Sequence, residues 1–226
     1  MAETLSQRLR TGFSKPHSRA WRLQRGLWNG ELDHATAATR SRSMRQILFI
    51  QGGGADVHDA WDDKLVASLK RELGKGYEVR YPRMPDEDEP RFAKWKPAIA
   101  REIAGLDEGA VLIGHSIGGT MLVHALAEKP ARHPPAAIIL ISAPFVGEGG
   151  WPSDEIEAKP DLGARLPDGV PVHLFHGSED DTAPPSHAEL YARAIPQAEV
   201  HRLHGRDHQL NDDLEEVAEV VKGLRN

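Results

Sequence analysis

The residues with the clearest potential for chemistry lie in the stretch VLIGHSIGGT, residues 111–120 of this 226-residue chain. The stretch contains Gly114, Ser116 and Gly118 in a Gly-x-Ser-x-Gly pattern that directly follows a run of apolar residues. Such a pattern is typical of a strained turn between a buried strand and a helix, which lifts the serine hydroxyl out of the sheet. The residues two positions before and two positions after the serine must be small because larger side chains would collide in the turn. Ser116 is therefore a candidate nucleophile, and the alternative is a tight corner with an incidental serine.

A serine nucleophile requires a general base and an acid that orients the base. Asp180 and Asp181 follow the apolar run PVHLFH, and His208 follows the run AEVHRL. Asp180 could instead form an Asx-type turn or cap a helix. His204 is a second candidate base, but it lies nearer the end of a strand, where a packing role is more natural. The pattern therefore favours His208 as the base of Ser116 and leaves the choice between the two aspartates open.

These candidates need secondary structure that brings them together. After residue 43 the chain contains six short apolar runs, and several of them are continuously apolar, as expected for strands that are covered on both faces. The runs are QILFIQ, YEVRY, AVLIGH, AAIILIS, PVHLFH and AEVHRL. Helical periodicities lie between or after them, at Trp61, Leu65, Leu69 and Leu73, over residues 92–106 and over residues 210–224. The pattern predicts an α/β fold, a three-layer α/β/α sandwich around a mostly parallel six-stranded sheet. Ligands bind at the carboxyl ends of the strands in such a sheet.

Three further stretches match a known family in order and position. HGSEDDTAP (176–184) resembles the acid loop of α/β-hydrolases, and GRDHQL (205–210) resembles their Gly-x-x-His stretch before the final helix. FIQGGG (49–54) resembles the turn that supplies a donor to the oxyanion hole. From Met44 onward the chain therefore resembles a compact α/β-hydrolase without a large cap domain, of the bacterial or retinoblastoma-binding-protein-9-like type.

The resemblance implies catalytic roles for the candidate residues. Alignment with the acid loop selects Asp180 rather than Asp181 as the residue that orients the imidazole. Ser116 would attack an acyl carbonyl and form an acyl-enzyme intermediate. His208 would take the proton of the serine and pass it to the leaving group.

The resemblance also implies an oxyanion hole. Its donors would be the backbone N–H groups of Ile117 and Gly53, with Gly54 as the alternative second donor. Gly114 and Gly118 would form the nucleophile elbow on either side of the serine.

The remaining histidines suggest no metal site. His115 is expected to point to the opposite side of the turn from its neighbour in the chain and to be structural. We expect His173 and His176 to serve packing and loop hydrogen bonding. His204 and His208 have the spacing of one helical face, but their context favours a loop and lacks the glutamate of the zinc-protease signature. Neither a metal nor a cofactor is expected.

The substrate is less well specified than the reaction. Residues 142–169 leave room for one short helix and a loop, so Phe145, Trp151 and Ile156 could line an acyl pocket or simply close the surface. The acidic segment 86–89 follows a strand end and could border the cleft. We expect hydrolysis of small carboxylic esters. The alternatives are a thioesterase, amidase or acyltransferase with the same triad, or a non-catalytic binding protein of this fold.

Composition excludes several other classes. The formal net charge is −6 with a pI near 6.1, which is unlike a nucleic-acid-binding protein. The chain has no cysteine and no apolar run long enough to span a membrane. Residues 1–43 carry eight Lys and Arg against three Asp and Glu. We expect them to form a flexible extension, or to derive from an upstream start codon, before a hydrolase domain over 44–226. We also expect a cytoplasmic protein that is a monomer or a small homo-oligomer.

Overall fold

The six apolar runs form six strands of one sheet. The computed structural model describes residues 44–224, so the expectations for residues 1–43 fall outside the described residues. The strands are β1 (Arg45–Ile50), β2 (Tyr77–Arg80), β3 (Val111–His115), β4 (Ala137–Ile141), β5 (Val172–Gly177) and β6 (Ala198–Leu203). Their order in the sheet is β2-β1-β3-β4-β5-β6, and every neighbouring pair is parallel. The predicted six-stranded parallel sheet is therefore confirmed.

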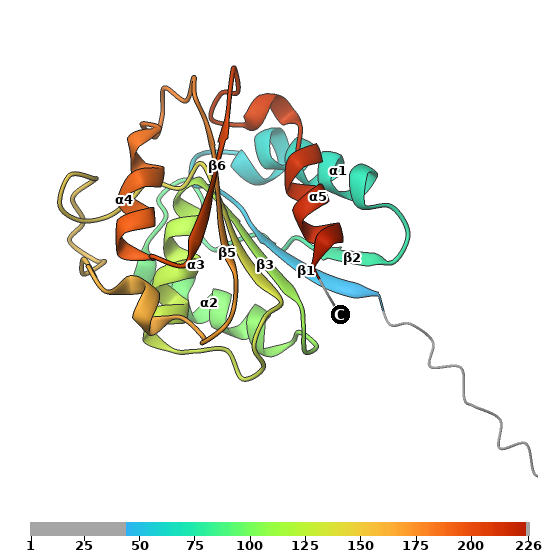
Figure 1. Cartoon of the computed structure of the whole chain (residues 1–226), viewed down its shortest axis with the longest axis horizontal. Coiled ribbons are helices and arrows are strands. Elements are labelled where there is room, and N and C mark those ends of the chain that lie inside the picture. Colours follow the sequence, from blue (N-terminus) through green and yellow to red (C-terminus); the bar gives the residue numbers. More distant parts are fainter. Residues whose placement is uncertain (1–43, 225–226) are drawn as a thin grey trace, which may run out of the picture. The chain divides into compact units, whose positions relative to one another are not determined.

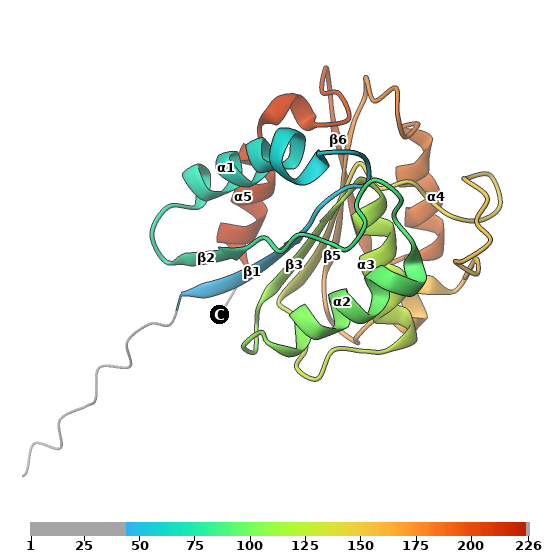
Figure 2. The same cartoon turned by 180° about the vertical axis from the view of Figure 1, so that it is seen from behind.

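Helices cover both faces of this sheet (Figures 1 and 2). One face is covered by α1 (Asp62–Leu73) and α5 (Glu215–Gly223). The other face is covered by α2 (Phe92–Ala104), α3 (Ser116–Glu128) and α4 (Ser186–Ala194). Apolar side chains of the central strands alternate between two hydrophobic cores, one under each helical layer. This is the expected three-layer α/β/α sandwich. Strands that are covered by helices on both faces of the sheet carry apolar side chains on both faces.

Two local expectations are wrong. Trp61 was expected on the buried stripe of the first helix, but it belongs to a π-helical turn (Val57–Trp61) and is 52% exposed. The C-terminal helix was expected from Leu210, but α5 begins at Glu215. Leu210, Asn211 and Asp212 all have positive φ angles and form a short turn that breaks the helix. Leu210 is nevertheless fully buried, so its apolar character reflects packing rather than α-helix.

The strand order reverses between β1 and β3, because β2 lies on one side of β1 while β3 to β6 follow on the other. Such a switch point opens a crevice at the carboxyl ends of the two strands. The turn after β1 contains the glycine-rich segment 52–54, and the turn after β3 contains Ser116. The topology therefore brings these two turns to the same end of the sheet.

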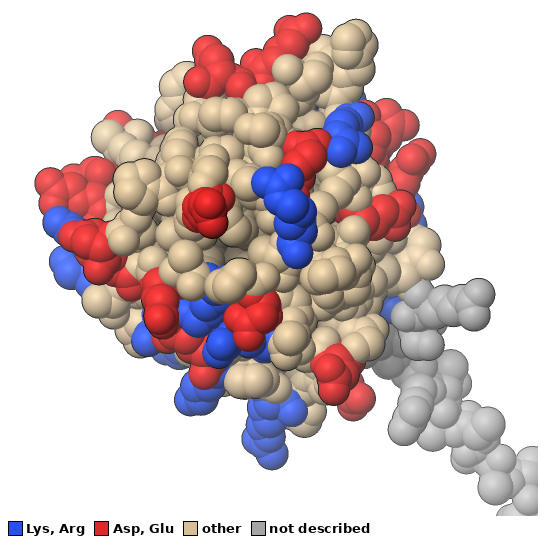
Figure 3. All heavy atoms as spheres, turned by 60° about the vertical axis from the view of Figure 1, so that its left-hand side comes forward, with Lys and Arg blue, Asp and Glu red and all other residues tan. Residues whose placement is uncertain are grey.

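Charged side chains of both signs are interspersed on the face of the domain that Figure 3 shows. A nucleic-acid-binding face is typically dominated by Lys and Arg, and this face does not have that character. Among the helices that the structure describes, none is both long and apolar enough to cross a membrane.

Candidate active site

Ser116 lies in a strained turn between β3 and α3. Its φ is 50°, in the left-handed region that residues other than glycine seldom adopt. A Cβ added to Gly118 would lie 1.9 Å from the carbonyl oxygen of Gln51, and one added to Gly114 would lie 2.5 Å from Cα of Gly119. Both contacts are with backbone and cannot be relieved by a side-chain rotation. The two glycines are therefore sterically required, as the Gly-x-Ser-x-Gly pattern predicts.

The structure brings Ser116, His208 and Asp180 together. Ser116 Oγ lies 3.0 Å from His208 Nε2. His208 Nδ1 lies 2.8 Å from Asp180 Oδ2 and 3.0 Å from Oδ1. A carboxylate can only accept, so Nδ1 carries the proton and Nε2 is left to accept from the serine hydroxyl. The rival residues Asp181 and His204 are exposed, and neither side chain forms a hydrogen bond or ion pair with these three side chains.

Asp180 is fully buried and well supplied with donors. Its Oδ1 accepts from the N–H groups of Thr182 (2.9 Å) and Ala183 (2.8 Å), and His176 Nε2 lies 3.0 Å from Oδ2. Burial alone would raise the pKa of Asp180, but the hydrogen bonds from His176, His208 and Ala183 outweigh it and the pKa is lowered. The Asx-type turn considered as an alternative role is thus present, and the same carboxylate also holds His208.

A second carboxylate–imidazole pair lies beside the first. His115 Nδ1 is 2.9 Å from Asp62 Oδ2, and His115 Nε2 is 3.2 Å from the backbone carbonyl oxygen of His208. The side chains of His115 and Asp62 are 1% and 0% exposed. Both partners of the imidazole are acceptors, and both ring nitrogens can donate only in the protonated form, so these contacts favour the imidazolium.

In this second pair, each group shifts the pKa of the other toward its charged form. Burial alone would lower the pKa of His115, but the charge and hydrogen bond of Asp62 outweigh it and the pKa is raised. Burial alone would raise the pKa of Asp62, but the attraction of His115 and a hydrogen bond from the Gly52 N–H at 2.7 Å outweigh it and the pKa is lowered. The pair therefore joins four segments: the turn after β1, the start of α1, the end of β3 and the loop that carries His208.

Sequence reasoning placed His115 in the scaffold and did not single out Asp62. An aspartate in the first turn of a helix is common, because its charge complements the helix dipole. No residue pattern links position 62 to position 115, so only the tertiary fold reveals this pair.

The three N–H groups of the glycine-rich turn have different partners. The Gly52 N–H donates to Asp62, and the Gly54 N–H donates to the carbonyl oxygen of Glu87 at 2.6 Å. Among the described residues, the Gly53 N–H has no hydrogen-bond partner. A Cβ added to Gly53 would lie 2.8 Å from Cγ2 of Ile117, so Gly53 is close to the residue that follows Ser116.

A cavity of about 410 Å³ opens next to Ile117. Trp151 and Ile156, two of the three residues proposed for an acyl pocket, line it, whereas Phe145 lines a separate pocket. Its other lining residues are Glu89, Pro90, Arg91, Phe92, Met121, Val146, Pro152, Ser153, Asp154 and Glu155. The acidic segment 86–89 thus borders the cavity through Glu89, as one reading of the sequence expected.

Comparison with solved structures gives close matches in fold. The esterase domain of a Rhodothermus marinus protein superposes with a TM-score of 0.56 and 23% sequence identity over 81% of this chain and 86% of that one. The ydeN gene product from B. subtilis superposes with a TM-score of 0.64 and 20% identity over 80% and 98% of the two chains. The esterase RhEst1 from Rhodococcus sp. ECU1013 superposes with a TM-score of 0.62 and 17% identity over 81% and 92%.

No functionally curated protein matches the sequence significantly. The family model described as "Serine hydrolase" matches residues 48–218, which is more than half of the chain and extends from β1 into α5. The solved structures agree with this match in the fold. The chain therefore belongs to the serine hydrolase family and has the α/β-hydrolase fold.

Proposed function

We propose that this hydrolase cleaves small carboxylic esters through a Ser116–His208–Asp180 triad and an acyl-enzyme intermediate. The observation that carries the proposal is the unbroken series of contacts from Ser116 Oγ through both ring nitrogens of His208 to the buried Asp180 carboxylate. Nucleophile, base and orienting acid have the mutual geometry that acyl transfer requires.

In the proposed reaction, Ser116 Oγ attacks the ester carbonyl while His208 Nε2 takes the hydroxyl proton. The imidazolium that forms is stabilised by the Asp180 carboxylate, which keeps its charge because its pKa is lowered. His208 then gives the proton to the departing alkoxide. A water molecule attacks the acyl-enzyme, with His208 again as base, and releases the acid and Ser116.

The developing oxyanion needs two N–H donors. We propose the N–H of Ile117, which belongs to the unpaired first turn of α3, and the N–H of Gly53. Gly54 was the alternative second donor, but its N–H is engaged by Glu87, which supports Gly53.

The substrate proposal rests on the cavity beside Ile117. Its volume of about 410 Å³ is near the lower end of the range for small-molecule pockets. Glu89, Asp154 and Glu155 line it against a single cation, Arg91, which is paired with Glu155 at 2.9 Å. We therefore expect neutral acyl esters to be preferred over esters whose acyl group carries a carboxylate.

Labelling with a fluorophosphonate probe tests the proposal. Wild type should be labelled covalently, and Ser116→Ala should be folded but unlabelled. Hydrolysis of p-nitrophenyl esters should fall steeply as the acyl chain lengthens. A folded wild type that resists labelling would favour the binding-protein alternative, and a clear preference for long acyl chains would contradict the small-ester assignment.

A further inference from the structure

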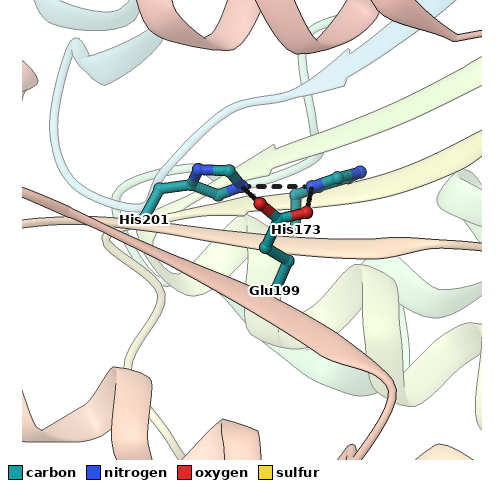
Figure 4. Close-up of side chains that lie close together, drawn as sticks. All are labelled: His173, Glu199 and His201. Carbon is teal, nitrogen blue, oxygen red and sulfur yellow. Dashed lines mark hydrogen bonds and ion pairs between the residues drawn. The ribbon is translucent and has the colours of Figure 1, made fainter.

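Three potential metal ligands meet on the two last strands of the sheet. His173 lies on β5, and Glu199 and His201 lie two residues apart on β6. Figure 4 shows the three side chains pointing toward one another. In the described part of the chain, this is the one group of three or more His, Asp or Glu residues whose donor atoms all lie within 4.8 Å of one another. The residues belong to no part of the proposed triad or oxyanion hole.

The separations between the donor atoms fit the coordination sphere of a small divalent ion. His173 Nδ1 lies 3.1 Å from His201 Nε2. Glu199 Oε2 lies 3.6 Å from His173 Nδ1, and the other carboxylate oxygen, Oε1, lies 3.8 Å from His201 Nε2. Tetrahedral sites with bonds of about 2.0–2.2 Å have ligand–ligand separations of about 3.3–3.6 Å. The contacts to Glu199 are too long for ordinary hydrogen bonds. The carboxylate therefore faces both imidazoles across a gap of the size an ion fills.

Backbone pairing holds the three donors in place. In the β5–β6 register His173 is opposite Glu199, and Phe175 is opposite His201. The ring of His201 stacks on Phe175 with centroids 4.3 Å apart and planes 7° from parallel. Phe175 is buried in the core under α1 and α5, so it fixes the plane of the His201 ring. His173 is 8% exposed, whereas Glu199 is on the surface, so the cluster is open to solvent on one side.

We propose that His173, Glu199 and His201 form a binding site for one divalent transition-metal ion of the Zn²⁺ class. Two imidazoles and one carboxylate suit such an ion, whereas Mg²⁺ and Ca²⁺ prefer oxygen ligands alone. Three protein ligands leave a fourth position for water on the open side. In the metal-free cluster one imidazole donates to the other. On binding, that imidazole carries its proton on its other ring nitrogen, so both facing nitrogens present lone pairs.

The site is structural rather than catalytic. His173 and Gly177 are four residues apart on β5, a distance of about 13 Å along a strand. An ion at His173 therefore does not touch the reacting atoms, which lie beyond the carboxyl end of β5. It would instead tie the edge strand β6 to β5. Because a bound ion stabilises only the folded state, Zn²⁺ should raise the unfolding temperature.

The test is a Zn²⁺ titration of the untagged full chain after removal of metal with a chelator. Wild type should bind Zn²⁺ with a rise in Tm, and Mg²⁺ should produce no rise. Glu199→Gln and His201→Gln should each weaken Zn²⁺ binding by at least about tenfold, since even the loss of an outer-shell partner of a metal site costs about 10- to 100-fold. Co²⁺ bound to wild type should give the visible bands of four- or five-coordinate cobalt. Glu199→Gln should abolish these bands and leave esterase activity unchanged.

Two control variants locate the ion. His204→Gln removes an exposed histidine just beyond the same strand, and His208→Gln removes the proposed catalytic base. Both should bind Zn²⁺ as wild type does. The proposal is overturned if folded wild type binds Zn²⁺ no more tightly than Glu199→Gln. It is also overturned if His204→Gln or His208→Gln weakens binding as much as His201→Gln does.

Discussion

Two buried carboxylate–imidazole pairs meet at the turn that carries Ser116, and they differ in the partner of the second ring nitrogen. In the Asp180–His208 pair this nitrogen faces a serine hydroxyl, and the imidazole is 14% exposed. In the Asp62–His115 pair it donates to a backbone carbonyl, and the imidazole is 1% exposed. The first imidazole can therefore exchange a proton with the serine, whereas the second is held between two acceptors and its protonated form is favoured. The same pair of residue types can therefore provide a base or a structural ion pair, depending on solvent access and hydrogen bonding.

The largest expected effect is on the first pair. Asp180→Asn should lower kcat by about 10⁴-fold, because the amide no longer enforces the productive tautomer of His208. The measurement is p-nitrophenyl acetate hydrolysis under saturating conditions. Asp181→Asn is the matched control in the same loop and should retain wild-type activity. Equal losses in the two variants would mean that the loop, rather than the Asp180 carboxylate, matters.

The next effect concerns the glycine-rich turn between the two pairs. Gly53→Ala should lower kcat by about 10²- to 10³-fold, the cost of losing one oxyanion donor. Its Cβ would lie 2.6 Å from Cγ of Pro90 and 2.8 Å from Cγ2 of Ile117, so the turn must shift. Gly223→Ala adds a Cβ in open space and should leave kcat unchanged. Gly53→Ala keeps the backbone N–H but displaces it, so wild-type turnover in this variant would contradict the proposed role of the Gly53 N–H as an oxyanion donor.

A smaller effect on catalysis, with a large effect on stability, is expected from the second pair. Asp62→Asn leaves the buried His115 without its counter-charge and should lower the free energy of unfolding by about 3 kcal/mol. It should lower kcat by about 10- to 100-fold, because His115 and the Gly52 N–H both lose their anchor and the two loops at the site shift. Kinetics and urea unfolding measure the two effects.

Asp63→Asn, the exposed neighbour on the same helix, is the control for this variant and should match wild type in both measurements. If Asp62→Asn unfolded more readily yet turned over at the wild-type rate, the pair would stabilise the fold without positioning the site.

The smallest effect is on the pH dependence of stability. The lowered pKa of Asp62 stabilises the fold above the ordinary carboxyl value of 3.8, and this is lost as the pH falls through the folded value. The raised pKa of His115 stabilises the fold below its ordinary value of 6.5, and this is lost as the pH rises through the folded value.

The advantage of wild type over Asp62→Asn should therefore be greatest between these two ordinary values and should shrink as the pH rises above 6.5. Urea unfolding at a series of pH values measures the difference, with Asp63→Asn as the reference. A difference independent of pH would mean that His115 is not charged in the folded protein.

The sequence predicts those parts of this fold that depend on local pattern. Short apolar or alternating runs identify all six strands, and the spacing of Gly114 and Gly118 identifies the turn at Ser116. Contacts between distant segments leave no such trace. Asp62 meets His115 across 53 residues, and His173 meets Glu199 and His201 through the register of β5 and β6. For Trp61 the local pattern is present but misleading. Its spacing matches the buried stripe of a helix, but it lies in a π-helical turn and is exposed.

The backbone angle of Ser116 also has a thermodynamic consequence. A residue other than glycine at φ 50° costs about 1–2 kcal/mol of stability, which glycine at the same position would recover. Ser116→Gly should therefore be the more stable protein, although it lacks the hydroxyl. A protein that only bound its ligand would gain from that exchange. Under the proposed mechanism, Ser116 is an instance of the trade-off in which activity comes at the expense of stability.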